Sequence, residues 1–162
     1  MSNELHDLLD VCIQNATNEE TAVLKEILQG VHLKQLHGVG FVSGLFQMER
    51  KMDEQFCEIT MPITPLTMNP LGIVHGGITA TLIDSAMGSL SNLLVPAGKV
   101  VVTTQLNINY LAPGTGESLK CIAKVEHKGS KTMVLSATVY RNDGKKVAQS
   151  TGSFFIINSV SL

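Results

Sequence analysis

The feature that most constrains the fold is the run of residues 75–94, HGGITATLIDSAMGSLSNLL. Over these twenty positions Asp84 is the only acidic or basic residue apart from His75. The pair Val95-Pro96 ends the run, because proline cannot continue a helix. At 1.5 Å per residue the run predicts a helix about 30 Å long. Since it has no charged face to turn to water, we expect it to be buried nearly all round.

One stripe of this predicted helix consists of small residues around a single carboxylate. Its members recur at intervals of three and four: Gly77, Ala80, Thr81, Asp84, Gly88 and Ser91. Small residues let another backbone or a thin ligand approach closely. Burying a carboxylate without a task costs free energy, which favours a functional role for Asp84. The alternative is helix–sheet packing in which Asp84 is held by hydrogen bonds.

Strands are predicted after the helix. The four segments with strand character are 99–111, 117–128, 131–141 and 146–157. They are separated by turn residues at 113–116, 129–130 and 142–145. Short turns make consecutive strands antiparallel neighbours. The pattern predicts a meander that curls around the central helix in one α+β domain.

The segments before the helix divide into two kinds. Residues 3–15 and 19–36 carry apolar side chains at helical spacing, and Asn18 is expected to cap the second of these helices. Residues 39–50 and 55–62 alternate apolar and polar side chains, which indicates two strands. We therefore expect a helical N-terminal extension at 1–38 and an α+β domain at 39–162. The extension either packs on the rest of the domain or forms a lid or a partner surface.

Composition and charge exclude several classes of protein. Of the 162 residues, 44% are hydrophobic and 16% charged, as in globular proteins, and without Trp and with two Tyr there are few rings to stack nucleic-acid bases. Residues 1–54 carry 4 basic and 9 acidic side chains, a net charge of -5, which argues against a DNA-binding arm. Residues 117–162 carry 7 basic and 3 acidic side chains, a net charge of +4. These basic residues form either a solvated face or a surface for a phosphate-bearing ligand.

The compartment follows from the cysteines and from the start of the chain. The three cysteines lie far apart without a Cys-x-x-Cys pair, so they indicate free thiols in a reducing compartment. The first residues lack a basic region, and no apolar run approaches the ~18 residues of a membrane span. We expect a cytoplasmic protein that binds neither nucleic acid nor membrane.

Hydrogen-bond donors gather where the long helix begins. The first N–H groups of a helix have no partner within it and favour an anion or a polarised carbonyl oxygen. His75-Gly76-Gly77 leaves room for a substrate to reach this backbone. Asn69, in the Pro-punctuated loop 64–72, can add a side-chain N–H to the same oxygen. Two such donors would stabilise a negative charge that develops during a reaction.

Geometry separates these donors from the acid. Asp84 comes eight positions after Gly76, which places their backbones about 12 Å apart along a helix. An Asp side chain cannot close that gap. If both groups act on one carbonyl, Asp84 must come from a second copy of the helix that runs antiparallel beside the first. The chemistry would then require a two-fold dimer with two equivalent sites at its interface.

Two stretches of the chain resemble a known family. The segment Asn69-Pro-Leu-Gly-Ile-Val-His75-Gly-Gly-Ile-Thr-Ala-Thr-Leu-Ile-Asp84 and the strand Val102-Thr-Thr-Gln-Leu-Asn-Ile-Asn-Tyr-Leu-Ala-Pro113 are similar to the hotdog-fold acyl-CoA thioesterases of the phenylacetate-pathway (PaaI) type. The resemblance extends over residues 40–157. It implies a hotdog fold, in which an antiparallel sheet wraps around one long central helix. The helical N-terminal segment is additional to the family's minimal core.

The resemblance also implies roles for residues at matching positions. Asp84 would be the nucleophile or general base, while the Gly76 N–H and Asn69 would polarise the thioester carbonyl across a dimer interface. His75 would lie near the thioester as a positioning group. The remaining expected contacts are Thr103 with water, Gly77 and Thr81 with substrate, and Lys128 and Lys131 with coenzyme A phosphates.

The resemblance implies no cofactor, since coenzyme A is part of the substrate, and it implies a homodimer that pairs into a homotetramer. No histidine spacing typical of a metal site occurs, so we expect no metal. Hydrolysis of an acyl-CoA is the function that the residues favour. Two alternatives remain at this point: a binding module that holds acyl-CoA without turnover, and a hotdog hydratase or dehydratase.

Overall fold

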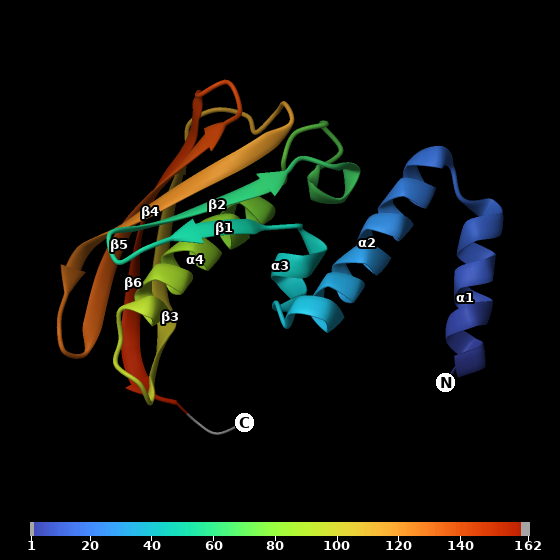
Figure 1. Cartoon of the computed structure of the whole chain (residues 1–162). Coiled ribbons are helices and arrows are strands. Elements are labelled where there is room, and N and C mark those ends of the chain that lie inside the picture. Colours follow the sequence, from blue (N-terminus) through green and yellow to red (C-terminus); the bar gives the residue numbers. More distant parts are fainter. Residues whose placement is uncertain (1, 160–162) are drawn as a thin grey trace. The chain divides into compact units, whose positions relative to one another are not determined.

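The computed structural model describes residues 2–159, which divide into two compact units between Gln47 and Met48. The first unit is helical. The second contains one sheet and one long helix (Figure 1). Each unit is described by itself below.

The first unit contains the helices α1 (Ser2–Asn15), α2 (Asn18–His37) and α3 (Phe41–Leu45). Thr17, and not Asn18 as predicted, is the N-cap of α2. The Thr17 hydroxyl accepts a hydrogen bond from the Glu20 N–H at 3.2 Å, and the Glu20 carboxylate accepts one from the Thr17 N–H at 2.8 Å. This reciprocal capping box satisfies two backbone donors at once, and Asn18 has no Glu or Gln at the matching spacing.

The strand predicted at 39–50 is wrong for most of its length. Phe41–Leu45 forms α3, and strand β1 begins only at Glu49. Gly44 crosses Gly30 of α2 so closely that a Cβ on Gly44 would lie 2.5 Å from the Gly30 carbonyl oxygen. This backbone contact between two helices outweighs the local alternation of apolar and polar residues, which is a weak signal over so few residues.

The second unit is built on a six-stranded antiparallel sheet with the strand order β1-β2-β4-β5-β6-β3. The strands are β1 (Glu49–Met52), β2 (Phe56–Pro62), β3 (Lys99–Tyr110), β4 (Ser118–Lys128), β5 (Thr132–Arg141) and β6 (Lys146–Asn158). Strands β4, β5 and β6 are consecutive neighbours, as predicted. The connection at 113–116 is different, because it leads from β3 at one edge of the sheet to β4 beside β2.

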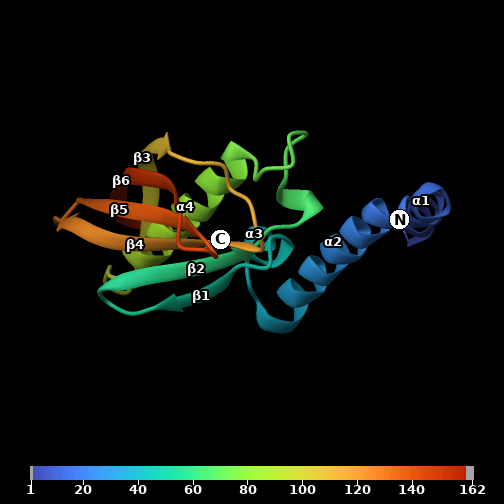
Figure 2. The same ribbon diagram turned by 90° about the horizontal axis from the view of Figure 1, so that it is seen from above.

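Helix α4 (Gly76–Leu93) is the long helix that the sequence predicts. It packs against β2, β3, β4, β5 and β6, and the sheet curves around it (Figures 1 and 2). The alternate residues of the strands that face α4 are buried, as period-two patterning requires. Gly152 of β6 allows a close approach to α4, because a Cβ there would lie 2.8 Å from the Met87 sulfur.

Only one side of α4 is buried within its own chain. Leu82, Ile83 and Leu90 are inaccessible, whereas Gly77 and Asn92 are exposed. The expectation of burial nearly all round is therefore wrong for the single chain. The exposed side still carries no basic residue, and it lies beside the edge strand β3, most of whose residues are exposed.

Candidate active site

The loop before α4 is organised by Asn69. Its Oδ1 accepts hydrogen bonds from the N–H groups of Leu71 at 2.9 Å and Ile73 at 3.5 Å, and its own N–H donates to the Ile73 carbonyl at 2.9 Å. Gly72 allows this turn with φ at 70°. Because Oδ1 is the acceptor, the side-chain NH₂ of Asn69 remains as a donor. It has no acceptor among residues 2–159.

The start of α4 is fixed by His75, its N-cap. The His75 Nδ1 accepts a hydrogen bond from the Gly77 N–H at 2.9 Å, and the His75 N–H donates to the Thr67 carbonyl at 2.9 Å. An imidazole that accepts at Nδ1 carries its proton at Nε2 and is neutral. In this arrangement His75 is a helix cap, and the N–H of Gly77 is occupied by the chain itself.

Gly76 is the first residue of α4, and its N–H has no acceptor within the described part of the chain. Gly76 and Asn69 line one hollow of about 380 Å³, together with apolar residues of the 110–114 segment. We call it the donor hollow; its lining includes Asn69, Ile73, Gly76, Tyr110, Leu111 and Pro113. No Asp or Glu lines it. The two residues predicted to be donors therefore line one hollow.

Asp84 lies two turns further along α4 and faces a different hollow. The Thr103 hydroxyl of β3 donates a hydrogen bond to Asp84 Oδ1 at 2.8 Å. The carboxylate is partly exposed in the chain, so the expectation that it is buried is wrong. We call this hollow, of about 310 Å³, the acid hollow; its lining includes Arg50, Asp84, Ser85, Ser89, Asn92 and Thr103.

A β-bulge in β3 brings Thr103 to Asp84. The register of β3 against β6 shifts between Thr103 and Gln105, which leaves Thr104 as an extra residue. Thr104 donates instead to the Ser153 carbonyl at 3.0 Å. Because successive strand residues point to opposite faces, Thr103 and Tyr110, seven apart, would otherwise face opposite ways. The bulge turns both of them toward α4, where Tyr110 donates to the Gly76 carbonyl at 2.8 Å.

The donor hollow and the acid hollow have no lining residue in common. The structure thus brings Asn69 to Gly76, and Thr103 to Asp84, but it does not bring the donors to the acid within one chain. Of the other predicted residues, Thr81 donates to the Gly77 carbonyl on its own helix. Lys128 and Lys131 are exposed beside the β4–β5 turn and line neither hollow.

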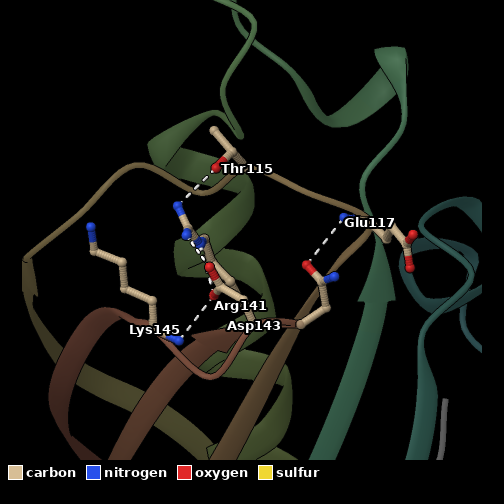
Figure 3. A network of polar contacts seen from close by, with 6 residues as sticks. Thr115, Glu117, Arg141, Asp143 and Lys145 are labelled. Carbon is tan, nitrogen blue, oxygen red and sulfur yellow. Dashed lines mark hydrogen bonds and ion pairs between the residues drawn. The ribbon is translucent and has the colours of Figure 1, made fainter.

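Sequence reasoning missed a network that supports the donor hollow (Figure 3). The Arg141 guanidinium binds the Asp143 carboxylate through two N–H groups and donates to the Thr115 hydroxyl at 3.0 Å. Asn142 accepts from the Glu117 N–H at 3.3 Å. These contacts tie the β5–β6 turn to the 111–117 segment, whose Gly114 carbonyl accepts from the Val74 N–H at 2.9 Å. The hydrogen bonds from Arg141 lower the pKa of Asp143 to about 2.

The buried cysteines lie apart from both hollows. Burial raises the pKa of Cys57 to about 11, and burial together with neighbouring Cys57 raises that of Cys121. Both thiols therefore remain protonated near neutral pH. Within residues 2–159, no group of three or more His, Cys, Asp or Glu side chains is arranged to hold a metal ion. None of the described helices is long and apolar enough to cross a membrane.

Comparison with known proteins shows which family the chain belongs to. The sequence model of the Thioesterase superfamily matches residues 71–148. The acyl-coenzyme A thioesterase PaaI of Escherichia coli is 33% identical over 98 residues, which cover 60% of this chain and 68% of that protein. The chain belongs to the thioesterase superfamily. As a member it is a thioester hydrolase, and the PaaI-type resemblance on Asn69, His75 and Asp84 agrees with this.

Solved structures extend the likeness of this thioesterase to nearly the whole chain. The BH2602 protein from Bacillus halodurans, solved with CoA, is 42% identical, with a TM-score of 0.84, and the match covers 90% of this chain and 98% of that one. The E. coli PaaI protein is 25% identical with a TM-score of 0.70, over 84% of this chain and 96% of that one. The predicted hotdog fold with a long central helix is confirmed.

Proposed function

We propose that this thioesterase hydrolyses an acyl-CoA to a free acid and coenzyme A. The observation that carries the proposal is the division of its polar groups between two hollows. The donor hollow offers two N–H donors without an acid, and the acid hollow offers a carboxylate with hydroxyl groups around it. Thioester hydrolysis needs the N–H donors and the carboxylate at the same carbonyl group. The donors stabilise the carbonyl oxygen, while the carboxylate and hydroxyl groups deliver water.

A second copy of the chain completes the site in this proposal. Gly76 and Asp84 stand about 12 Å apart along α4, so an antiparallel α4 from a partner would place its Asp84 at the level of Gly76. The two-fold axis then passes near Ala80, midway between them. The surface there consists of Gly77, Ala80 and Thr81, small enough for two helices to approach closely.

Strand β3 supports the same axis. Thr103 lies beside Asp84 and Tyr110 beside Gly76, so the level of Ala80 corresponds to Leu106 and Asn107 on β3. This strand is an edge of the sheet, twelve residues long and largely exposed, with backbone groups available for a further strand. Antiparallel pairing of two β3 strands around Asn107 would join two sheets and align the two α4 helices. Two such dimers would form the homotetramer that the resemblance implies.

The thioester carbonyl oxygen would bind between the Gly76 N–H and the Asn69 NH₂. Both hydrogen bonds strengthen as the oxygen becomes negative, so they stabilise the transition state more than the bound substrate. The neutral His75 caps the helix through Gly77, which keeps the peptide of Gly76 in place. Gly77 and Thr81 would line the path of the substrate along the helix.

The partner's carboxylate would then act in one of two ways. As a general base, Asp84 takes a proton from a water that attacks the carbonyl carbon, and the C–S bond breaks as coenzyme A leaves. As a nucleophile, it forms a mixed anhydride with loss of the thiol, and water then cleaves the anhydride. Thr103 donates its proton to Oδ1, so its oxygen lone pairs are left to hold the water and Oδ2 is left to react.

Coenzyme A is the thiol that we propose, since the BH2602 protein at 42% identity was solved with CoA. Lys128 and Lys131 are exposed cations on the basic C-terminal part and would meet its phosphates. The reaction uses the thioester, water and side chains, with no cofactor. We expect it to take place in the cytoplasm, where acyl-CoA is made and used.

The test is thiol release from a panel of aromatic, hydroxylated and aliphatic acyl-CoAs. The wild-type chain should release thiol from at least one of them, and Asp84→Asn should lower kcat by about 10³-fold, since it removes the base or nucleophile. Asp10→Asn on α1 is the matched control and should behave as wild type. Tight binding of acyl-CoA without thiol release, or full activity of a dimeric Asp84→Asn variant, would refute the proposal.

A further inference from the structure

The side chain of Tyr110 joins the end of β3 to the start of α4 in the donor hollow. Its hydroxyl donates to the Gly76 carbonyl at 2.8 Å, and its ring lies against Gly76. A Cβ placed on Gly76 would be 3.5 Å from the ring carbon and from the hydroxyl oxygen, an ordinary contact. Tyr110 as a residue is 54% exposed, so burial alone does not explain the position of its ring.

The contact adds a side-chain hydrogen bond at Gly76 to the cap that His75 makes through Gly77. Glycine is the residue with the greatest backbone freedom, and here it stands at the first position of a helix, where the backbone frays most readily. The carbonyl of the preceding His75 accepts from Ile78 at 3.0 Å and Thr79 at 3.1 Å. The hydroxyl of Tyr110 holds the Gly76 carbonyl, which lies on the other side of the Gly76 Cα. Both peptides that flank the Gly76 Cα are then held, and the Gly76 N–H has a defined direction.

We propose that Tyr110 is a positioning residue that fixes the Gly76 N–H for the substrate carbonyl. The inference rests on the proposed function. It assigns no contact between Tyr110 and the reacting atoms; Tyr110 acts through the backbone of Gly76. An oxygen that becomes negative in the transition state gains most from a donor whose direction is already set, because no reorganisation is needed during the reaction.

The experiment compares Tyr110→Phe with wild type. Phenylalanine keeps the ring against Gly76 and removes only the hydroxyl. We expect kcat to fall about tenfold, the value of one net hydrogen bond, with KM within about twofold of wild type. Tyr140→Phe is the matched control, because Tyr140 lies on β5 in a different hollow of the sheet. It is the only other tyrosine of the chain and should leave kcat unchanged.

A second readout does not depend on turnover. Without the hydroxyl, amide hydrogen exchange in the first turn of α4, at residues 78–80, should become several-fold faster, and Tyr140→Phe should leave it as in wild type. Wild-type kcat in Tyr110→Phe would overturn the inference, and so would a rise in KM at constant kcat, which would make Tyr110 a substrate contact. If Asp84→Asn still abolishes hydrolysis in that case, the proposed function stands. If no acyl-CoA is hydrolysed by wild type, unchanged exchange at residues 78–80 overturns the inference by itself.

Discussion

The donor hollow and the acid hollow lie along one helix and are opposite in chemistry. The donor hollow has two N–H groups without an acceptor among residues 2–159 and an otherwise largely apolar lining that includes Ile73 and Leu111. The acid hollow has a carboxylate, hydroxyl groups and Arg50. In the proposed function, either hollow alone binds part of a thioester, and neither cleaves it. The difference is why we propose a pair of half-sites as the unit of function, since one chain carries the two about 12 Å apart along α4.

Among substitutions that change only one of the two hollows, we expect Gly76→Pro to lower kcat most. Gly76 is the first residue of α4, where proline fits, and His75 before it has φ −60° and ψ 134°, which proline also accepts. The substitution therefore removes the N–H and leaves the helix in place. We expect kcat to fall by about 10² to 10³-fold, measured as thiol release.

Gly76→Ala is the control for that substitution. It keeps the N–H, and its Cβ meets Tyr110 at an ordinary distance of 3.5 Å. We expect Gly76→Ala to retain most of the wild-type kcat. Equal losses in the alanine and proline variants would mean that space at residue 76, and not the donor, is what hydrolysis requires.

A smaller effect is expected in the acid hollow from Thr103→Val. Valine has nearly the shape of threonine but cannot donate to Asp84 or hold water, so kcat should fall about tenfold. Thr104→Val is the matched control, because Thr104 lies in the bulge and bonds to the Ser153 carbonyl instead. If Thr103→Val is as active as Thr104→Val, Thr103 does not contribute to the reaction in the acid hollow.

Most of the second unit was predictable because its elements are long and strongly patterned. The predicted helix at 75–94 is α4 at Gly76–Leu93, and the last four strands match within one residue at each end. Asn69, Gly76 and Asp84 could be proposed as site residues because they fall near the start of α4 and along its length. What the sequence could not supply depends on contacts between distant segments. The edge position of β3, the Gly30–Gly44 crossing and the bulge at Thr104 are of this kind.

Tyr110 shows why part of the candidate site could not be predicted. Alternation along a regular strand places residues 103 and 110 on opposite faces, so no pattern joins both of them to one helix. Only the register shift reveals that both face α4. Arg141 was missed for a similar reason, because its partners Thr115 and Asp143 come from two separate connections.

The smallest effect concerns the Arg141 network, which ties the β5–β6 turn to the 111–117 segment beside the donor hollow. The pKa of Asp143 is lowered to about 2 in the folded chain, below its value of about 3.9 in an unfolded chain. The stabilisation by this pair is therefore fully present above the unfolded pKa and is lost as the pH falls through about 2.

We expect Asp143→Asn to have a slightly lower Tm than wild type at pH 7. Thermal unfolding at each pH measures the difference in Tm between the two proteins. This difference should narrow as the pH is lowered from 5 toward 2.5. A difference in Tm that stays constant over this range would show that the ion pair does not stabilise the turn.

The central claim is that each active site joins the donor hollow of one chain to the acid hollow of another. The most direct measurement mixes two inactive variants, Asp84→Asn and Gly76→Pro, with different affinity tags, and assays the reassorted dimers. In a mixed dimer one site has both mutations and the other has none, so random pairing should restore about a quarter of wild-type kcat per chain. Doubly tagged dimers that form but release no more thiol than the separate variants would contradict the claim.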